Sequence, residues 1–152
     1  MKTLFFAITL FASSLVFAQV STPADLVKVN KNCQNLPTPA SIEGKWYVGN
    51  MTDPNSGMTF HMSFVISKTS TTSVLMCQGP GWNLSANVTT PSLYTPSTFA
   101  ITGSGFDQTT QGGSNCQLNV QPANLKYSFS GGCLVMQDSM TGETQTLSPI
   151  NP

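Results

Sequence analysis

After Gly44 the chain alternates apolar and polar residues in short runs, and this alternation constrains the fold more than any other feature. In residues 58–66, every second residue is Met, Phe or Ile, while most of the residues between them are polar or small. Side chains that alternate in this way point to opposite faces of a β-strand, so the run predicts a half-buried strand. Similar runs occupy residues 44–48, 82–89, 98–102, 116–120, 125–130, 133–137 and 144–148.

Turn sequences rich in Gly, Pro and Asn separate these runs, as at residues 79–81 and 112–114. No helical period of useful length follows residue 40. About eight strands with short connections predict an antiparallel meander, and such a meander closes readily into a small barrel without exposed edges. We therefore expect an all-β fold over residues 41–152.

The first 18 residues predict a secretory signal peptide. A short charged start, Met1-Lys2, precedes an apolar stretch that ends in Val16-Phe17-Ala18, a cleavage sequence before Gln19. The stretch is short for a membrane span. The prediction is a secreted, extracellular protein with an N-terminal arm over residues 19–40 and one barrel domain after it.

Four cysteines remain after residue 18: Cys33, Cys77, Cys116 and Cys133. An even number of cysteines in an oxidising compartment indicates two disulfides. The alternative is a zinc site of four thiolates, but such sites contain closely spaced pairs and the spacings here are long. From the residues alone, all three pairings are open.

Charged residues are only 8% of the chain, against about 25% in typical domains. The chain contains no Arg and no basic cluster, which argues against nucleic acid as a partner. His61 is the only histidine and lies on the polar side of its run. No nucleophile elbow or metal-ligand cluster is present, so we expect no catalytic residues, no metal and no cofactor, and a protein that is not an enzyme.

Three Asn residues head N-x-Ser/Thr sequences that accept N-linked glycans in secreted proteins: Asn50, Asn83 and Asn87. Asn83 and Asn87 lie four apart, so they share one face of a strand. Trp82, Leu84 and Val88 alternate with them and lie on the opposite face. The pattern therefore predicts glycosylation on the solvent side.

Gly44-Lys45-Trp46-Tyr47, preceded by the arm with Cys33, resembles the opening of lipocalins. The resemblance implies that Trp46 closes one end of the barrel, that the other end admits a small apolar ligand, and that Gly44 and Trp46 are structural. It also implies that the arm is tied to a distant strand. On that basis we expect Cys33–Cys116 and Cys77–Cys133, although the residues alone leave the other pairings open.

The resemblance covers mainly residues 33–50, and the chain departs from the family elsewhere. Lipocalins carry an Arg near the last strand that packs over the Trp; here Lys126 or no residue takes that role. The family's mid-chain Thr-Asp-Tyr motif is missing, and the chain leaves no room for its C-terminal helix. Avidins share a Gly-Lys-Trp start, but a biotin site uses several tryptophans and this chain has only Trp46 and Trp82.

The leading hypothesis for function is a secreted, lipocalin-like carrier of a small apolar or amphipathic ligand. Its cavity would be lined by inward residues of the strands: Phe60, Met62, Phe64, Met76, Leu84, Phe99, Ile101, Tyr127 and Phe129. The alternative is a secreted interaction protein, such as an inhibitor, adhesin or host-directed factor, with a filled core and a binding loop at residues 91–96. An eight-stranded barrel allows either.

Overall fold

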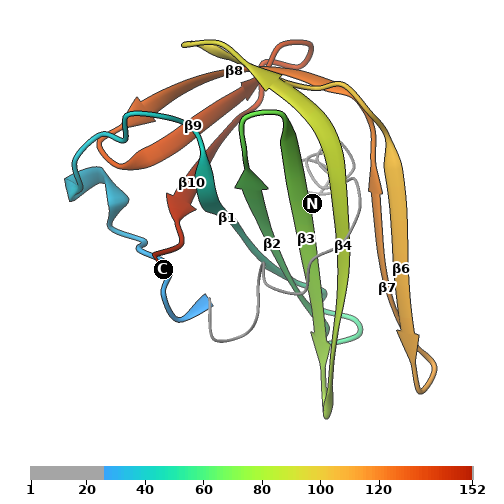
Figure 1. Ribbon diagram of the computed structural model, residues 1–152. Helices are drawn as coiled ribbons and strands as arrows, with labels where there is room; N and C mark the ends of the chain where they lie inside the picture. The colour runs from blue at the N-terminus through green and yellow to red at the C-terminus, as the bar shows by residue number, and fades with distance from the viewer. Residues whose placement is uncertain (1–25, 152) are drawn as a thin grey trace.

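The computed structural model describes residues 26–151, which fold into ten β-strands and one short 3-10 helix, η1 (Figure 1). The expected all-β class is confirmed, whereas the expected signal peptide lies outside the described residues. The elements are η1 (Cys33–Asn35), β1 (Gly44–Thr52), β2 (Thr59–Ile66), β3 (Ser70–Gly79), β4 (Trp82–Tyr94), β5 (Thr98–Ile101), β6 (Gly105–Gln111), β7 (Ser114–Val120), β8 (Ala123–Ser130), β9 (Cys133–Asp138) and β10 (Thr144–Pro149).

Eight of the strands close into an antiparallel barrel in the order β1-β10-β9-β8-β5-β4-β3-β2. Strands that follow one another in the chain are neighbours, except that β5 pairs with β8 because β6 and β7 leave the wall as a separate two-stranded hairpin. The barrel closes where Trp46 and Tyr47 of β1 pair with Pro149 and Ser148 of β10. The predicted closed meander of eight strands is therefore confirmed.

The strands that form the barrel differ in part from the predicted runs. Strand β3 was not predicted, because Val74-Leu75-Met76-Cys77 is apolar without interruption and is buried on both faces. Strand β6 was not predicted either, because only one residue in Gly105–Gln111 is a large apolar one. The predicted run at residues 116–120 is β7, which lies in the hairpin and not in the barrel wall.

The interaction loop expected at residues 91–96 is largely strand. Strand β4 continues to Tyr94, and its last residues pair with β5 from Ser92↔Ile101 to Tyr94↔Phe99. Pro91 is tolerated because the next N–H, that of Ser92, donates to Thr69 on the β3 side. Pro91, which has no N–H to donate, therefore faces the other edge of β4, at a point before the pairing with β5 begins. Only the short turn between β4 and β5 remains as a loop in this region.

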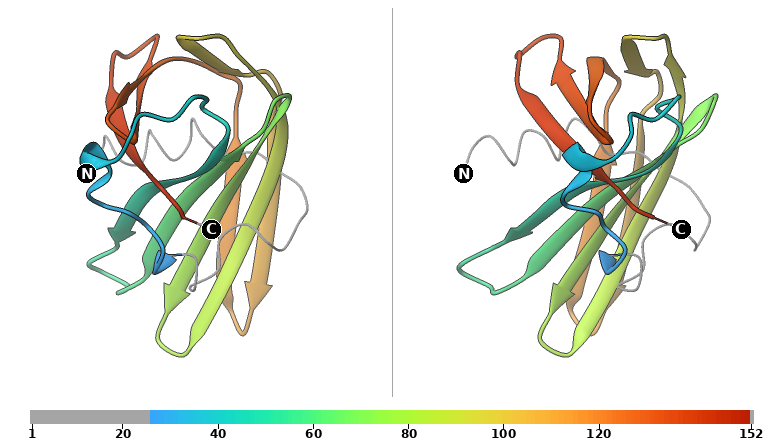
Figure 2. Two further views of the ribbon diagram at one scale, coloured as in Figure 1. Left: turned by 60° about the vertical axis from the view of Figure 1, so that its left-hand side comes forward. Right: turned by 90° about the vertical axis from the view of Figure 1, so that its left-hand side faces the viewer.

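One end of the barrel is covered by the N-terminal arm, as Figure 2 shows from two sides. The arm runs from η1 over the turn between β8 and β9, where Gly132 N–H donates to Cys33 O over 2.8 Å. Contact is so close that a Cβ on Gly131 would lie 2.1 Å from Gln34 O. The arm then leads into β1, so its contacts fix the place where Trp46 enters the barrel.

Trp46 fills the barrel beneath the arm. Its side chain is 3% exposed, and its Nε1–H donates to the Ile42 carbonyl over 2.8 Å. Phe129 lies beside it, with 6.2 Å between the ring centroids. Lys126 does not take the role of the missing Arg, because it alternates with the inward residues Leu125 and Tyr127 and is exposed. The end-closing position of Trp46 agrees with a lipocalin-like layout.

The disulfides are Cys33–Cys133 and Cys77–Cys116. The pairing that the lipocalin resemblance implied, Cys33–Cys116 with Cys77–Cys133, is therefore wrong. Cys133 begins β9 directly under the arm, so it meets Cys33. Cys116 lies on β7, which packs against β3 and brings it to Cys77. One bridge ties the arm to the barrel, and the other ties the hairpin to it.

We predict that Trp46→Ala lowers the free energy of unfolding by about 3–5 kcal/mol, the usual cost of deleting a buried Trp side chain. Trp46→Phe keeps most of the buried ring and loses the hydrogen bond to Ile42, so it should cost less. Chemical denaturation of both variants measures these losses. An Ala variant as stable as the wild type would contradict the plug role of Trp46.

Candidate functional site

Most of the expected cavity residues lie together on the inner wall of the barrel. The register of β2, β3 and β4 places one face of each strand on a common apolar cluster, which β5 also joins. Of the expected lining residues, five are buried in this cluster and three pack against it half-buried. The buried five are Met62, Phe64, Leu84, Phe99 and Ile101, and the half-buried three are Phe60, Tyr127 and Phe129.

Met76 is the exception among the expected lining residues. Its neighbour Cys77 pairs with Phe60 and Leu84 on the inner face, so Met76 points to the outer face, where it pairs with His61 and Ser85. The expectation placed Met76 inside because β3 gave no alternating pattern from which its direction could be assigned.

The end of the barrel opposite Trp46 carries two half-buried aromatic residues, Phe60 and Trp82. Phe60 pairs with Met51 near the end of β1, and Trp82 begins β4. Gly79 makes room for the Trp82 ring: a Cβ at that position would lie 2.4 Å from it. Trp82 was not among the expected cavity residues, although its alternation with Leu84 indicates the same face.

The β6–β7 hairpin packs against β3 and β4. Its apolar residues Cys116, Leu118 and Val120 belong to the same cluster as Leu75 and Leu84. Leu118 and Val120 were not among the expected cavity residues, and their run, residues 116–120, lies in the hairpin. The hairpin therefore supplies part of the interior that a simple meander would leave to the wall strands.

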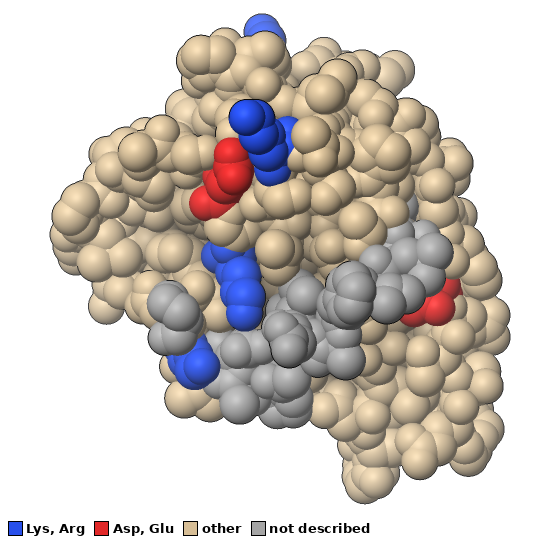
Figure 3. Space-filling model, in the orientation of Figure 1, with Lys and Arg blue, Asp and Glu red and all other residues tan. Residues whose placement is uncertain are grey.

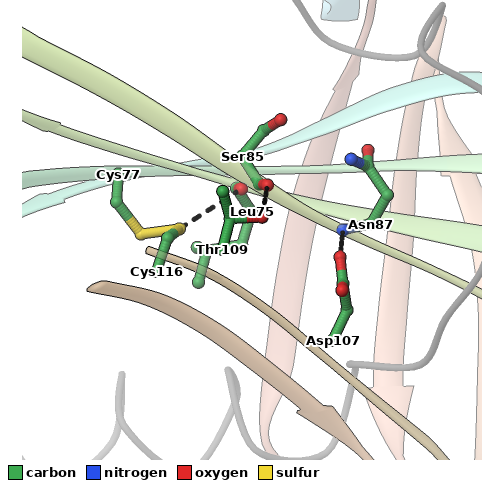
Figure 4. Close-up of a disulfide and its surroundings, with 7 residues drawn as sticks. All are labelled: Leu75, Cys77, Ser85, Asn87, Asp107, Thr109 and Cys116. Atoms are coloured by element: carbon green, nitrogen blue, oxygen red, sulfur yellow. Dashed lines mark hydrogen bonds between the residues drawn. A yellow bond between two sulfur atoms is a disulfide. The ribbon is translucent and has the colours of Figure 1, made fainter. Parts of the chain in front are cut away.

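Side chains of β6 bind the backbone of β4 in place of a strand ladder (Figure 4). The Asn87 N–H donates to Asp107 Oδ2 over 2.7 Å, and the Thr109 hydroxyl donates to the Ser85 carbonyl over 2.8 Å. These bonds provide partners for backbone groups on the edge of β4 that no neighbouring strand pairs. The Cys77–Cys116 bridge, drawn beside them, covalently fixes the hairpin.

The single histidine takes part in a row of polar groups on the outer face. His61 Nδ1 lies 3.4 Å from the Tyr47 hydroxyl, and its Nε2 lies 3.0 Å from Gln78 Oε1. These residues come from β1, β2 and β3, with the imidazole half-buried between the other two. Among residues 26–151, no group of three or more His, Cys, Asp or Glu side chains could hold a metal ion.

The three glycosylation sequons also lie on the outer face. Asn50 pairs with His61, Asn83 with Gln78 and Asn87 with Val74, all of them positions that face away from the core cluster. Asn50 and Asn83 are exposed, whereas Asn87 is partly buried. The predicted separation of Asn83 and Asn87 from the apolar side of β4 is confirmed; glycosylation itself stays a prediction.

Charged side chains are few and scattered on the face drawn in Figure 3, where they form no continuous patch of one sign. Among the charged residues that the structure describes, Glu43 has a definite structural role, because its side chain accepts a hydrogen bond from the Tyr94 hydroxyl. Within the part of the chain that the structure describes, no helix is long and apolar enough to span a membrane.

Comparison with known proteins gave no relative. The chain matches no protein-family model, no curated protein and no solved structure. The closed barrel, the arm and the position of Trp46 are compatible with a lipocalin-like layout.

We predict that replacing Cys77 and Cys116 by Ala lets the β6–β7 hairpin open more readily than the strands of the barrel. The bridge closes 39 residues of sequence, and a crosslink of that length stabilises a fold by roughly 4 kcal/mol. Amide hydrogen exchange in β6 and β7 should accelerate more than exchange in β2. The Cys33→Ala/Cys133→Ala variant is the control and should loosen the arm instead. Equal protection of the hairpin with and without its bridge would refute this.

We predict that Tyr47 and Tyr127 ionise at a higher pH than an unperturbed tyrosine does. Burial raises the pKa of both hydroxyls above the usual 10.0, and the neighbouring Tyr94 raises that of Tyr127 further. Because the folded pKa exceeds the unfolded one, the stability linked to these groups is complete below pH 10.0 and falls as the pH rises through the folded pKa. Phenolate absorbance of the wild type, Tyr47→Phe and Tyr127→Phe measures this; ionisation of all tyrosines together near 10.0 would contradict it.

Proposed function

We propose that this protein is a secreted, non-enzymatic binding protein that holds a small apolar molecule inside its barrel. The observation that carries the proposal is the contrast between the two ends. Trp46 and the arm cover one end, whereas inward aromatic side chains at the other end, Phe60 and Trp82, remain half-buried. Half-buried aromatic surface inside a concave wall is the usual lining of a ligand site.

The composition of the wall supports an uncharged ligand. Of the inward-facing residues that the structure describes on β2, β3, β4 and β5, none is charged. Burial of an ionised ligand against such a wall would be costly, because no opposite charge compensates for lost hydration. The expected partner is therefore a small hydrophobic molecule, as in lipocalins.

Two further features agree with an extracellular site of action. Two disulfides are typical of proteins that fold in oxidising compartments. The sequon residues Asn50 and Asn83 are exposed on the outer face, so glycans there would leave the interior free.

The test compares two phenylalanines with a neutral fluorescent probe, N-phenylnaphthylamine. Phe60 is inward and half-buried, while Phe106 on β6 is 57% exposed and lies on the opposite face of the hairpin from Asp107. We predict that Phe60→Ala weakens probe binding about 5- to 30-fold, because loss of one aromatic contact costs roughly 1–2 kcal/mol. Phe106→Ala should leave binding unchanged.

The alternative function, an interaction protein with a filled core, predicts different results. The wild type would bind no probe, and Phe64→Ala would lose about 3–5 kcal/mol of stability, as expected for a cavity opened in a packed core. A protein that binds its ligand next to Phe64 should lose less, because part of that ring would then contact the ligand instead of other core side chains. Thermal unfolding with and without the probe separates the two functions.

A further inference from the structure

A row of four hydroxyl side chains lies inside the barrel on β3 and β4. Thr71 and Ser73 come from β3, and Thr90 and Ser92 come from β4. The ladder between these strands is continuous from Ser70↔Pro91 to Gly79↔Trp82, so all four share the face of Leu75 and Leu84. Each is at most 2% exposed.

Only two of the four hydroxyls have a hydrogen-bond partner. The Thr71 and Ser92 hydroxyls bind each other over 2.8 Å. Ser73 Oγ and Thr90 Oγ1 are buried without a partner. A buried hydroxyl without a partner lowers stability, and an apolar side chain of the same shape would avoid that loss. Stability alone therefore does not explain why Ser73 and Thr90 carry hydroxyl groups at these buried positions.

The surroundings of the two orphaned hydroxyls are apolar and uncharged. Ser73 pairs with Phe64 on one side and with Val88 on the other, both in the core cluster. Thr90 pairs with Thr71 and is a diagonal neighbour of Ser73. Diagonal neighbours on one face of a sheet lie about 7–8 Å apart, so the two hydroxyls belong to the same part of the inner face.

We propose that Ser73 and Thr90 bind the uncharged oxygen of the ligand, in a hydroxyl or a carbonyl group, and thereby select amphipathic ligands of this class. This inference rests on the proposed function and adds a specificity to it. The oxygen lies near Phe64, towards the Trp46 end, and the hydrocarbon part extends towards Phe60 and Trp82. A carboxylate is disfavoured at this position because none of the inward-facing residues described on β2 to β5 is a cation that would compensate its charge.

The experiment measures displacement of N-phenylnaphthylamine from the purified, oxidised protein by decan-1-ol, decane and decanoate. The wild type should bind decan-1-ol about 5- to 10-fold more tightly than decane, the effect of one or two neutral hydrogen bonds, and decanoate least. In Thr90→Val the preference for the alcohol over the alkane should shrink by about 5-fold while decane binds as before.

Thr71→Val is the matched control. Thr71 pairs with Thr90 across the strands, but its hydroxyl already has a protein partner, Ser92. The variant should lower thermal stability and keep the alcohol preference. Thr90→Val should be at least as stable as the wild type when no ligand is bound. This opposite pattern of stability and selectivity marks Thr90 as a ligand-binding group.

The outcomes separate the two proposals. If no compound displaces the probe because the probe itself does not bind, the proposed function fails. If decane and decan-1-ol bind equally, or Thr90→Val keeps the alcohol preference, binding in the barrel stands and the role of Ser73 and Thr90 is overturned.

Discussion

The packing of Trp46 under the N-terminal arm is the interaction on which the rest of the structure depends. Trp46 lies on β1 at the seam where the sheet closes, opposite Pro149 of β10. Its indole N–H donates to the Ile42 carbonyl, in the segment that leads from the arm into β1, and its ring lies beside Phe129 of β8. One side chain thus joins the arm, the closing strand pair and the far wall, and it determines which end of the barrel is shut.

A second constraint is that the barrel wall opposite β1 and β2 contains a very short strand, β5. Strand β5 has only four residues, so most of β4 has no ladder partner on that side. The hairpin of β6 and β7 occupies this gap and uses Asp107 and Thr109 in place of backbone pairing. Because such a contact is weaker than a ladder, the Cys77–Cys116 bridge holds it. The interior is therefore bounded by the eight strands of the barrel and a tethered hairpin.

The sequence was sufficient for the parts of the fold that depend on local patterns. Alternation in β2 and in the first half of β4 gave the direction of Phe60, Phe64 and Leu84, and Gly44-Lys45-Trp46 gave the closed end. It was not sufficient where burial on both faces removes the alternation, which is why β3 was missed and Met76 was placed inside. Cysteine pairing depends on which strands meet in space, and no local pattern encodes that. The orphaned hydroxyls of Ser73 and Thr90 could not be found for the same reason.

In the proposed function, an apolar molecule occupies the barrel between the Trp46 end and the end with Phe60 and Trp82. The most direct measurement is a set of intermolecular nuclear Overhauser effects between isotope-labelled protein and unlabelled decan-1-ol. With decan-1-ol inside the barrel, we expect contacts from its alkyl protons to the rings of Phe60, Phe64 and Trp82. Contacts confined to exposed outer residues such as Leu93 and Phe106, or none at all, would contradict it.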